Sequence, residues 1–374
     1  MPNAAFKLLD LVLLFGAIQG LLLAIFLWNQ SLRNRWALRF LALFILCFAL
    51  NSIFNVMEAL GLRQGLTFYE FLPLYCSLSI ISMFGLFVDF TVHPQQSFQR
   101  KHYWWLVPPA VQFLLQTGLL ILFFVQRTVI FENLNFIIGI YNRLDLFGIG
   151  FGLFVLISAI FKINRYEKTL QNNYAETGNI SLQWLKKLIL VLFGIWISFA
   201  IPTIYEQVTA QPSIEIFYPM WIATSVLIYW IGYSAIFKKE VFNIELFTQV
   251  TPVKKLSEKT APYYDQLLLL MQTEQPWLQS DLNLKTLADK LQISSGYLSQ
   301  IINQYEQKNF FDFVNGYRVE EVKKLLQNEK MAHLSLLGIA YEAGFKSKST
   351  FNLAFKKLAG ITPSAYRKSL KTNS

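Results

Sequence analysis

The chain has 374 residues, of which 54% are hydrophobic and 15% charged, and its formal net charge is +10 at pH 7. Soluble domains average about 25% charged residues, so this composition excludes a chain built only of ordinary soluble domains. Its length leaves room for two or three domains. The charge deficit is uneven: residues 1–237 hold 14 Lys and Arg and 10 Asp and Glu, whereas residues 238–374 hold 19 and 13.

Cysteine and histidine usage predicts neither a disulfide framework nor a metal site. The two cysteines, Cys47 and Cys76, lie inside apolar runs, where small buried hydrophobes are expected. The three histidines, His93, His102 and His333, are too scattered to suggest metal ligands. We therefore expect no cofactor, no metal, no catalytic residue and no enzyme activity.

Long apolar stretches occupy the first 237 residues and predict a polytopic helical membrane domain. A helix needs about 20 residues to cross 30 Å of hydrocarbon. The first run continues to Trp28 without a small-residue cleavage site, which favours a retained span over a signal peptide. The seven predicted spans are roughly residues 6–28, 37–60, 71–90, 103–125, 137–161, 185–205 and 217–237.

The connectors between these spans alternate in charge. The first, third and fifth, together with the first turn of the span that follows each, carry ten Lys and Arg in total, whereas the second and fourth carry only Arg63 and Arg127 and the sixth carries none. Positive residues mark the cytoplasmic side. The bias predicts a multi-pass protein of the inner (plasma) membrane, with its N-terminus outside and everything after Phe237 in the cytoplasm.

Four charged residues fall inside or beside the predicted spans: Glu58, Asp89, Arg143 and Asp145. Charges at membrane depth are candidates for signal reception. The alternative is that each side chain snorkels to the interface, because all lie within about a turn of a predicted span end. Arg143 and Asp145 are two residues apart and do not face each other on a helix.

Residues 238–262 form a basic connector, and residues 263–374 have the composition of a soluble helical domain. Within it, residues 284–305 show the spacing of a helix-turn-helix. Ser294 is the expected N-cap of its second helix. The predicted outward residues of that helix are Ser295, Gly296, Ser299, Gln300 and Asn303.

A second helix-turn-helix is predicted over residues 335–358, joined to the first by a helix over residues 310–326. Ala340 allows close helix crossing, and Gly344 supplies a positive φ for the turn. Ser347 is the expected cap, followed by outward-facing Lys348, Ser349, Asn352 and Lys356. From Gly344 to the end there are seven Lys or Arg and no acid, which suits phosphate.

Three stretches, LADKLQISSGYLSQIIN, FFDFVNGYRVEEVKKLL and IAYEAGFKSKSTFNLAFKKLAGITPSAYR, closely resemble the C-terminal domain of AraC/XylS-family transcription regulators. The resemblance spans residues 280–368. It implies that two helix-turn-helix units, joined by a long helix, insert their second helices into successive major-groove segments of double-stranded DNA.

The resemblance also assigns the DNA contacts by position. The base-reading candidates are Ser295, Gly296, Ser299, Gln300, Lys348, Ser349 and Asn352. The phosphate candidates are Ser294, Ser347, Lys356, Lys357, Arg367 and Lys368. Two departures stand out: Gln292 replaces a frequent turn glycine, which costs about 1 kcal/mol if its backbone is left-handed, and Leu353 stands where a polar reader is common.

The leading hypothesis is a membrane-embedded, sequence-specific transcription regulator whose membrane domain senses a signal or anchors the protein. The alternative is a transporter or membrane enzyme with an accessory regulatory tail, although no mid-membrane charge cluster of that kind is visible. The expected partners are promoter DNA, the lipid bilayer and an unidentified signal ligand. Two readers per chain suffice for a bipartite site, so the sequence leaves monomer and homodimer, and activator and repressor, open.

Overall fold

The computed structural model describes residues 4–30, 34–59, 68–94, 96–177, 181–209, 214–237, 260–331 and 333–372. Within these ranges the protein is helical, and its one extended pairing is an isolated bridge between Tyr174 and Asn283. The predicted all-α class is confirmed. Most of the basic connector, residues 238–259, lies outside the described ranges.

Two compact units divide the chain. The N-terminal unit comprises Met1–Ile163 and Leu182–Glu245, and the C-terminal unit comprises Asn164–Ser181 and Leu246–Ser374. The segment Asn164–Ser181 was expected within the membrane domain. It joins the C-terminal unit because Ala175 is buried in that unit's core.

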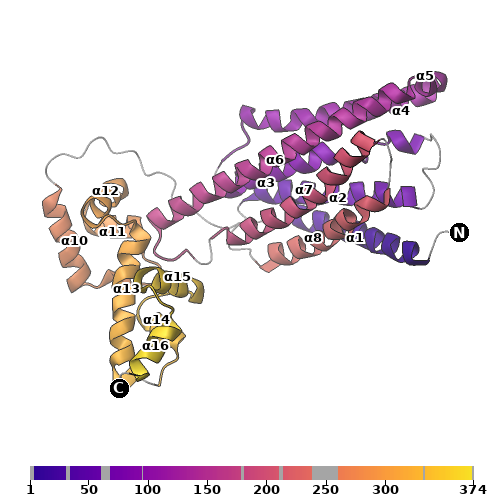
Figure 1. Cartoon of the computed structure of the whole chain (residues 1–374). Coiled ribbons are helices and arrows are strands. Elements are labelled where there is room, and N and C mark those ends of the chain that lie inside the picture. The colour runs from indigo at the N-terminus through magenta and orange to yellow at the C-terminus, as the bar shows by residue number, and fades with distance from the viewer. Residues whose placement is uncertain are drawn as a thin grey trace. The chain divides into compact units, whose positions relative to one another are not determined.

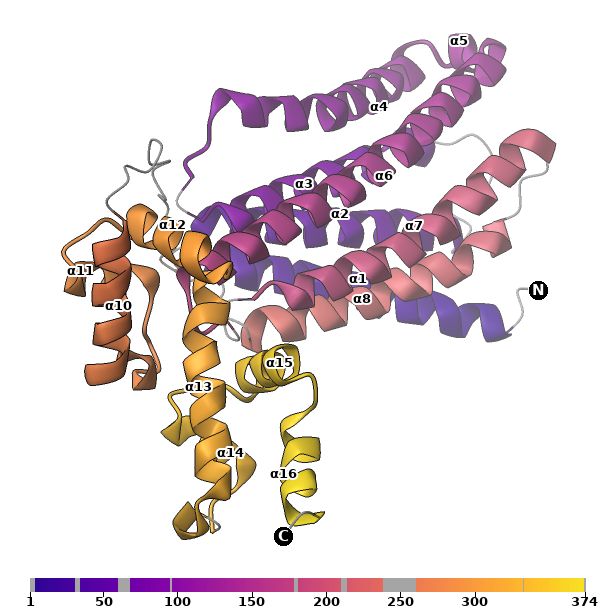
Figure 2. The same ribbon diagram turned by 60° about the vertical axis from the view of Figure 1, so that its left-hand side comes forward.

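The N-terminal unit is a set of long helices that run side by side (Figures 1 and 2). Helix α1 packs along α2 and α8, and α2 packs along α3. The bounds are α1 Ala4–Trp28, α2 Arg35–Ala59, α3 Ser77–Val92, α4 Val107–Val125, α5 Arg127–Glu132, α6 Leu134–Asn173, α7 Gln183–Thr209 and α8 Tyr218–Phe237. Short 3₁₀ turns, η1 Phe68–Phe71, η2 Arg100–Leu106 and η3 Ile214–Phe217, precede α3, α4 and α8.

Five of the described helical segments are long and apolar enough to cross a membrane: Leu11–Trp28, Arg35–Met57, Arg100–Val125, Leu134–Asn173 and Gln183–Thr209. Two further apolar segments, Ser77–Val92 and Tyr218–Ile231, are shorter. Large apolar side chains also lie on the outside of this unit, among them Leu22, Phe124, Phe161 and Leu190, which are 64–72% exposed. A soluble domain rarely exposes so much apolar surface.

The C-terminal unit is organised around one long central helix, α13, spanning Phe310–Gln327 (Figures 1 and 2). Before it come α10 Ala261–Thr273, η4 Pro276–Leu278, α11 Leu284–Lys290 and α12 Ser295–Glu306. After it come η5 Glu329–Met331, α14 Leu336–Glu342, α15 Lys348–Ala359 and α16 Pro363–Thr372. Helix α13 contacts α12, which precedes it in the chain, and α14 and α15, which follow it.

The faces of α13 bury into two separate cores. Phe310, Phe313 and Val314 join the core formed with α10, α11 and α12. Phe311 and Val322 join the core formed with α14 and α15. Both helix-turn-helix units therefore share one rigid helix, and its burial on two sides fixes their relative orientation within this unit.

Arg318 is the one large buried charge among the described residues of α13, at 0% exposure. Its Nε donates to the Trp277 carbonyl oxygen at 2.7 Å and its Nη2 to the Gln279 carbonyl oxygen at 2.8 Å. The guanidinium also lies 5.7 Å from the centre of the Phe345 ring, within range of a cation–π interaction. Burial lowers the pKa of Arg318 to about 10, with the charges of Glu176 and Asp281 acting in the opposite direction, so it remains protonated at neutral pH. Arg318 thus ties the segment before α11 to the middle of α13.

The turn between α11 and α12 carries backbone strain at Gln292, whose φ is 55°. A side chain in the left-handed region costs about 1 kcal/mol relative to glycine. We expect Gln292→Gly to raise the unfolding free energy of the C-terminal unit by up to about 1 kcal/mol. The gain is reduced by the loss of the hydrogen bond from Gln292 Nε2 to the Asp289 carbonyl oxygen. Denaturant unfolding measures this change. The control is Gln304→Gly on the exposed face of α12, which should instead lower the unfolding free energy by about 1 kcal/mol.

Candidate functional site

The second helix-turn-helix presents a polar face on α15, opposite an inner face that is apolar except for Thr350. Phe351, Ala354 and Phe355 are buried beneath the helix. Lys348, Ser349 and Asn352, the three predicted readers on this helix, are exposed. Leu353 is 44% exposed among them, and its side chain has no hydrogen-bonding group with which to read a base.

The turn that leads into α15 has the predicted geometry. Gly344 has a φ of +86°, and the Ser347 hydroxyl caps the helix by accepting from the Thr350 backbone N–H at 3.2 Å. Ala340 is fully buried. The N-terminus of α15 therefore has the backbone N–H groups and the positive end of the helix dipole that favour binding of an anion.

The first helix-turn-helix is more covered than expected. Ser294 caps α12 by accepting from the Tyr297 N–H at 3.2 Å, as predicted. However, Gly296 is buried, which corrects its assignment as an outward reader. Helix α10, absent from the helix-turn-helix pattern, packs against α12, and the rings of Tyr263 and Tyr297 meet edge to face at 5.6 Å. Ser295, Ser299 and Gln300 are half-buried, whereas Asn303 is exposed.

The four basic residues among the predicted phosphate contacts fall into two groups. Lys356 and Lys368 are exposed. Lys357 instead pairs with Asp312 of α13, with its Nζ 2.7 Å from both carboxylate oxygens. Arg367 is half-buried and donates to the Leu334 carbonyl oxygen at 3.3 Å. The local charge count missed Asp312 because it lies 45 residues before Lys357 in the sequence.

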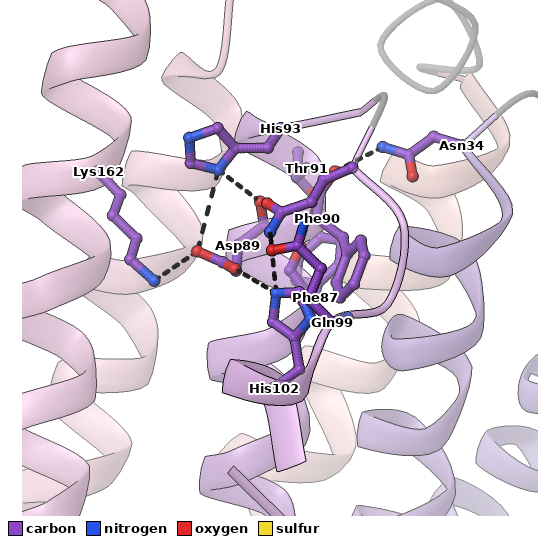
Figure 3. A network of polar contacts seen from close by, with 10 residues as sticks. Asn34, Phe87, Asp89, Phe90, Thr91, His93, Gln99, His102 and Lys162 are labelled. Carbon is purple, nitrogen blue, oxygen red and sulfur yellow. Dashed lines mark hydrogen bonds and ion pairs between the residues drawn. The ribbon is translucent and has the colours of Figure 1, made fainter. Parts of the chain in front are cut away.

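In the N-terminal unit, Asp89 is buried and paired rather than directed to the surface (Figure 3). Its Oδ1 lies 2.7 Å from Lys162 Nζ and its Oδ2 lies 3.3 Å from His102 Nε2. His93, one turn after Asp89, approaches the same carboxylate at 3.9 Å. Asp89 is therefore buried and paired inside the unit, with Lys162 of α6 and His102 of η2, which differs from the exposed position that snorkelling would give it.

The tautomer of His102 follows from its hydrogen bonds. Its Nδ1 accepts from the Gln99 backbone N–H at 2.8 Å, so this nitrogen carries no proton. The proton must then lie on Nε2, which faces Asp89. Sequence spacing does not predict this pairing, because Asp89 lies in α3 and His102 in the separate turn η2. Within the described residues no His, Cys, Asp and Glu group suits a metal ion.

The remaining charged candidates lie apart from this cluster. Asp145 Oδ1 accepts from the Tyr75 hydroxyl at 2.8 Å, whereas Arg143, two residues away, is exposed. The two therefore do not pair, as their spacing predicted. The side chain of Glu58 lies outside the described part of the structure.

Asp145 lines a cavity of about 900 Å³ within the N-terminal unit. Its walls come from α2, α3, α6, α7 and α8. The aromatic lining residues include Phe44, Trp196 and Trp221, and the polar ones include Asn51 and Glu206. None of the described lining residues is basic. This volume and this mixture of aromatic and polar groups are typical of small-molecule sites.

Comparison with known proteins identifies the C-terminal unit. Residues 287–369 match the model of a helix-turn-helix domain. The probable transcription factor PqrA of Proteus vulgaris is 32% identical over 97 residues, which cover 24% of this chain and 77% of PqrA.

Two longer relatives also match this chain over a stretch of about one domain. The Msm operon regulatory protein of Streptococcus mutans is 28% identical over 125 residues, 33% of this chain and 43% of that protein. The melibiose operon regulatory protein of Escherichia coli is 30% identical over 87 residues, 23% of this chain and 28% of that protein. The chain thus spans less than half the length of these two longer relatives. Through its C-terminal helix-turn-helix domain, the chain belongs to the AraC family of transcription regulators.

Proposed function

We propose that this protein is a membrane-embedded, sequence-specific regulator of transcription, in which the N-terminal unit receives a signal and the C-terminal unit binds promoter DNA. The observation that carries the DNA-binding part is the pair of capped helices, α12 and α15, held on the single helix α13. Lys348 and Asn352 supply the donors of the second reader: lysine suits guanine and asparagine suits adenine.

The DNA-binding proposal is tested with the full chain in lipid nanodiscs and a duplex selected by that chain from a random-sequence library. We expect Asn352→Ala to lower discrimination at one base position by about 10- to 100-fold. Lys356→Ala should instead weaken binding to all sequences and reduce the salt slope by about one. Lys324→Ala, an equal charge change at an exposed site on α13, serves as the control. Equal behaviour of Asn352→Ala and the control would contradict base reading by α15.

Membrane embedding is supported by five long apolar helical segments and by apolar side chains on the outside of the N-terminal unit. The alternation of positive connectors supports a cytoplasmic C-terminus. Membrane fractionation with a reporter fused after Ser374 tests both statements. Recovery of the intact chain in the soluble fraction would contradict membrane embedding, and a reporter located outside the cytoplasm would contradict the orientation.

A sensing role is favoured over a bare anchor by the cavity of about 900 Å³, which an anchor does not need. Asp145 and Glu206 contribute carboxylates, and with no basic group among the described lining residues the charge favours a neutral or cationic ligand. Filling the cavity should therefore abolish the response to the signal without preventing DNA binding.

Thr224 is 6% exposed and lines the cavity, whereas Val226, two residues later on α8, is 60% exposed. Thr224→Trp is the cavity-filling variant and Val226→Trp its matched control. Transcription of a reporter is measured across a panel of growth conditions, with protein levels in the membrane checked by blotting. An unchanged pattern for Thr224→Trp would support the anchor.

A further inference from the structure

The segment directly after α6, residues 174–177, docks on the DNA-binding unit. The methyl of Ala175 is fully buried in the core formed with α10, α11 and α12. Its carbonyl oxygen accepts from Asn315 Nδ2 of α13 at 2.8 Å. Tyr174 bridges to Asn283, the cap of α11. Three independent contacts therefore hold this short segment in place.

This docking places the Glu176 carboxylate at the start of α15. Its Oε1 accepts from the Ser347 hydroxyl at 2.5 Å and also from the Thr350 hydroxyl, and its Oε2 accepts from the Lys346 backbone N–H at 3.2 Å. A carboxylate here is favoured by the helix dipole and by charge-assisted hydrogen bonds.

These donors, at the start of α15, are of the kind that binds DNA phosphate. In helix-turn-helix proteins the recognition helix enters the major groove N-terminus first, and backbone N–H groups and hydroxyls at helix starts bind phosphate. Ser347 is one of the phosphate candidates, and Lys348 and Ser349 are adjacent readers. A carboxylate and a phosphate cannot share these donors, because both are acceptors and both are negative.

We propose that residues 174–177 form an autoinhibitory clasp, in which Glu176 competes with a DNA phosphate for the N-terminus of α15. This inference rests on the proposed DNA-binding function and adds its regulation. The clasp follows α6 with no intervening loop, and α6 has residues in both units, Leu134–Ile163 in one and Asn164–Asn173 in the other. A signal that shifts α6 withdraws Glu176 and frees the second reader.

The first test is Glu176→Gln in the full chain, reconstituted in nanodiscs, with affinity for the selected duplex measured across salt. Removing the charge should tighten binding by about tenfold, within the usual range of an intramolecular coupling. The slope of log Kd against log salt should steepen by about one, since one more phosphate contact forms. The matched control is Glu167→Gln, because Glu167 lies on the part of α6 that belongs to the same unit and its carboxylate accepts from the Ser181 hydroxyl at 2.8 Å.

The second test releases the clasp without altering Glu176. Ala175→Asp buries a carboxylate in an apolar site and should undock the segment. Tighter DNA binding by this variant cannot come from simple attraction, because the substitution adds negative charge. The double variant Ala175→Asp/Glu176→Gln should gain nothing beyond Ala175→Asp alone, since the two act through one contact. Hydrogen exchange in α12 and α13 verifies that the core stays folded.

The outcomes distinguish the clasp from the DNA-binding function on which it rests. If the wild-type chain, Glu167→Gln and Glu176→Gln bind DNA equally, DNA binding stands and the clasp is overturned. Weaker binding by Glu176→Gln also overturns it, because Glu176 would then be a structural cap that holds α15 in its binding form. No DNA binding by any variant would overturn both proposals.

Discussion

Gly344→Ala is expected to unfold the turn of the second helix-turn-helix and to abolish high-affinity DNA binding. A Cβ at this position would lie 2.5 Å from the Trp277 carbonyl oxygen and 2.8 Å from Leu278 Cα, both backbone atoms that cannot move aside cheaply. The φ of +86° adds a second penalty for any residue with a side chain. Together these cost about 3 kcal/mol or more. Hydrogen exchange of α14 and α15 in the full chain measures the loss, expected as protection lowered by about 100-fold or more.

Two other glycines of the same unit serve as controls. Gly360 also has a positive φ, +77°, but a Cβ there would meet nothing within 4 Å, so Gly360→Ala should cost only about 1 kcal/mol. Gly316 lies inside α13 with open space around it, and Gly316→Ala should stabilise the helix by about 0.5–1 kcal/mol. A similar small effect for Gly344→Ala would show that η4 does not press against this turn.

Arg318→Met is expected to destabilise the C-terminal unit by about 3 kcal/mol. The substitution keeps the apolar stem but leaves the carbonyl oxygens of Trp277 and Gln279 without their donor, and an unsatisfied buried group costs about 1–3 kcal/mol. Arg318→Lys should lower the unfolding free energy by less than Arg318→Met does, but it should not match the wild type, because one ammonium cannot reproduce the planar guanidinium that reaches both carbonyl oxygens. Urea unfolding of the C-terminal unit and DNA affinity are the measurements.

The control is Lys324→Met on the same helix. The Lys324 side chain is 75% exposed and its partner Glu321 lies 3.5 Å away, so its removal should change the unfolding free energy by less than about 0.5 kcal/mol. An equal effect of the two substitutions would mean that Arg318 contributes only its charge to the unit and not its buried hydrogen bonds.

The features that sequence predicted best depend on residues close together in the chain. The caps Ser294 and Ser347 each bond three residues ahead, and the left-handed backbone at Gln292 and Gly344 follows from turn chemistry. Hydrophobic periodicity likewise predicted the all-α class, because a helix repeats its inner face every three or four residues.

The features that sequence missed join distant residues. Arg318 bonds a carbonyl 41 residues away, and Glu176 reaches Ser347 across 171 residues. Asp89 meets Lys162 across 73 residues. No local pattern encodes such pairs. The one available signal was the position of Arg318, four residues after Val314 and four before Val322, which places it on the apolar face of the predicted helix and indicates a buried role rather than a solvated one.

The apparent basicity of the C-terminal stretch shows the same limit. Counted along the sequence, residues 344–374 contain no acid. In the folded unit, Asp312 neutralises Lys357 and Glu176 occupies the start of α15. The electrostatic surface around α15 is therefore less positive than the local composition indicates, and Glu176 accounts for part of the difference.

The sharing of α13 between the two cores has a consequence for the DNA itself. Each base pair turns the duplex by about 34°, with 10–10.5 base pairs per turn. A protein whose two readers are fixed on one buried helix cannot follow such a rotation. The operator should therefore have a fixed length, and one extra base pair between its halves should cost more affinity than a mismatch in either half.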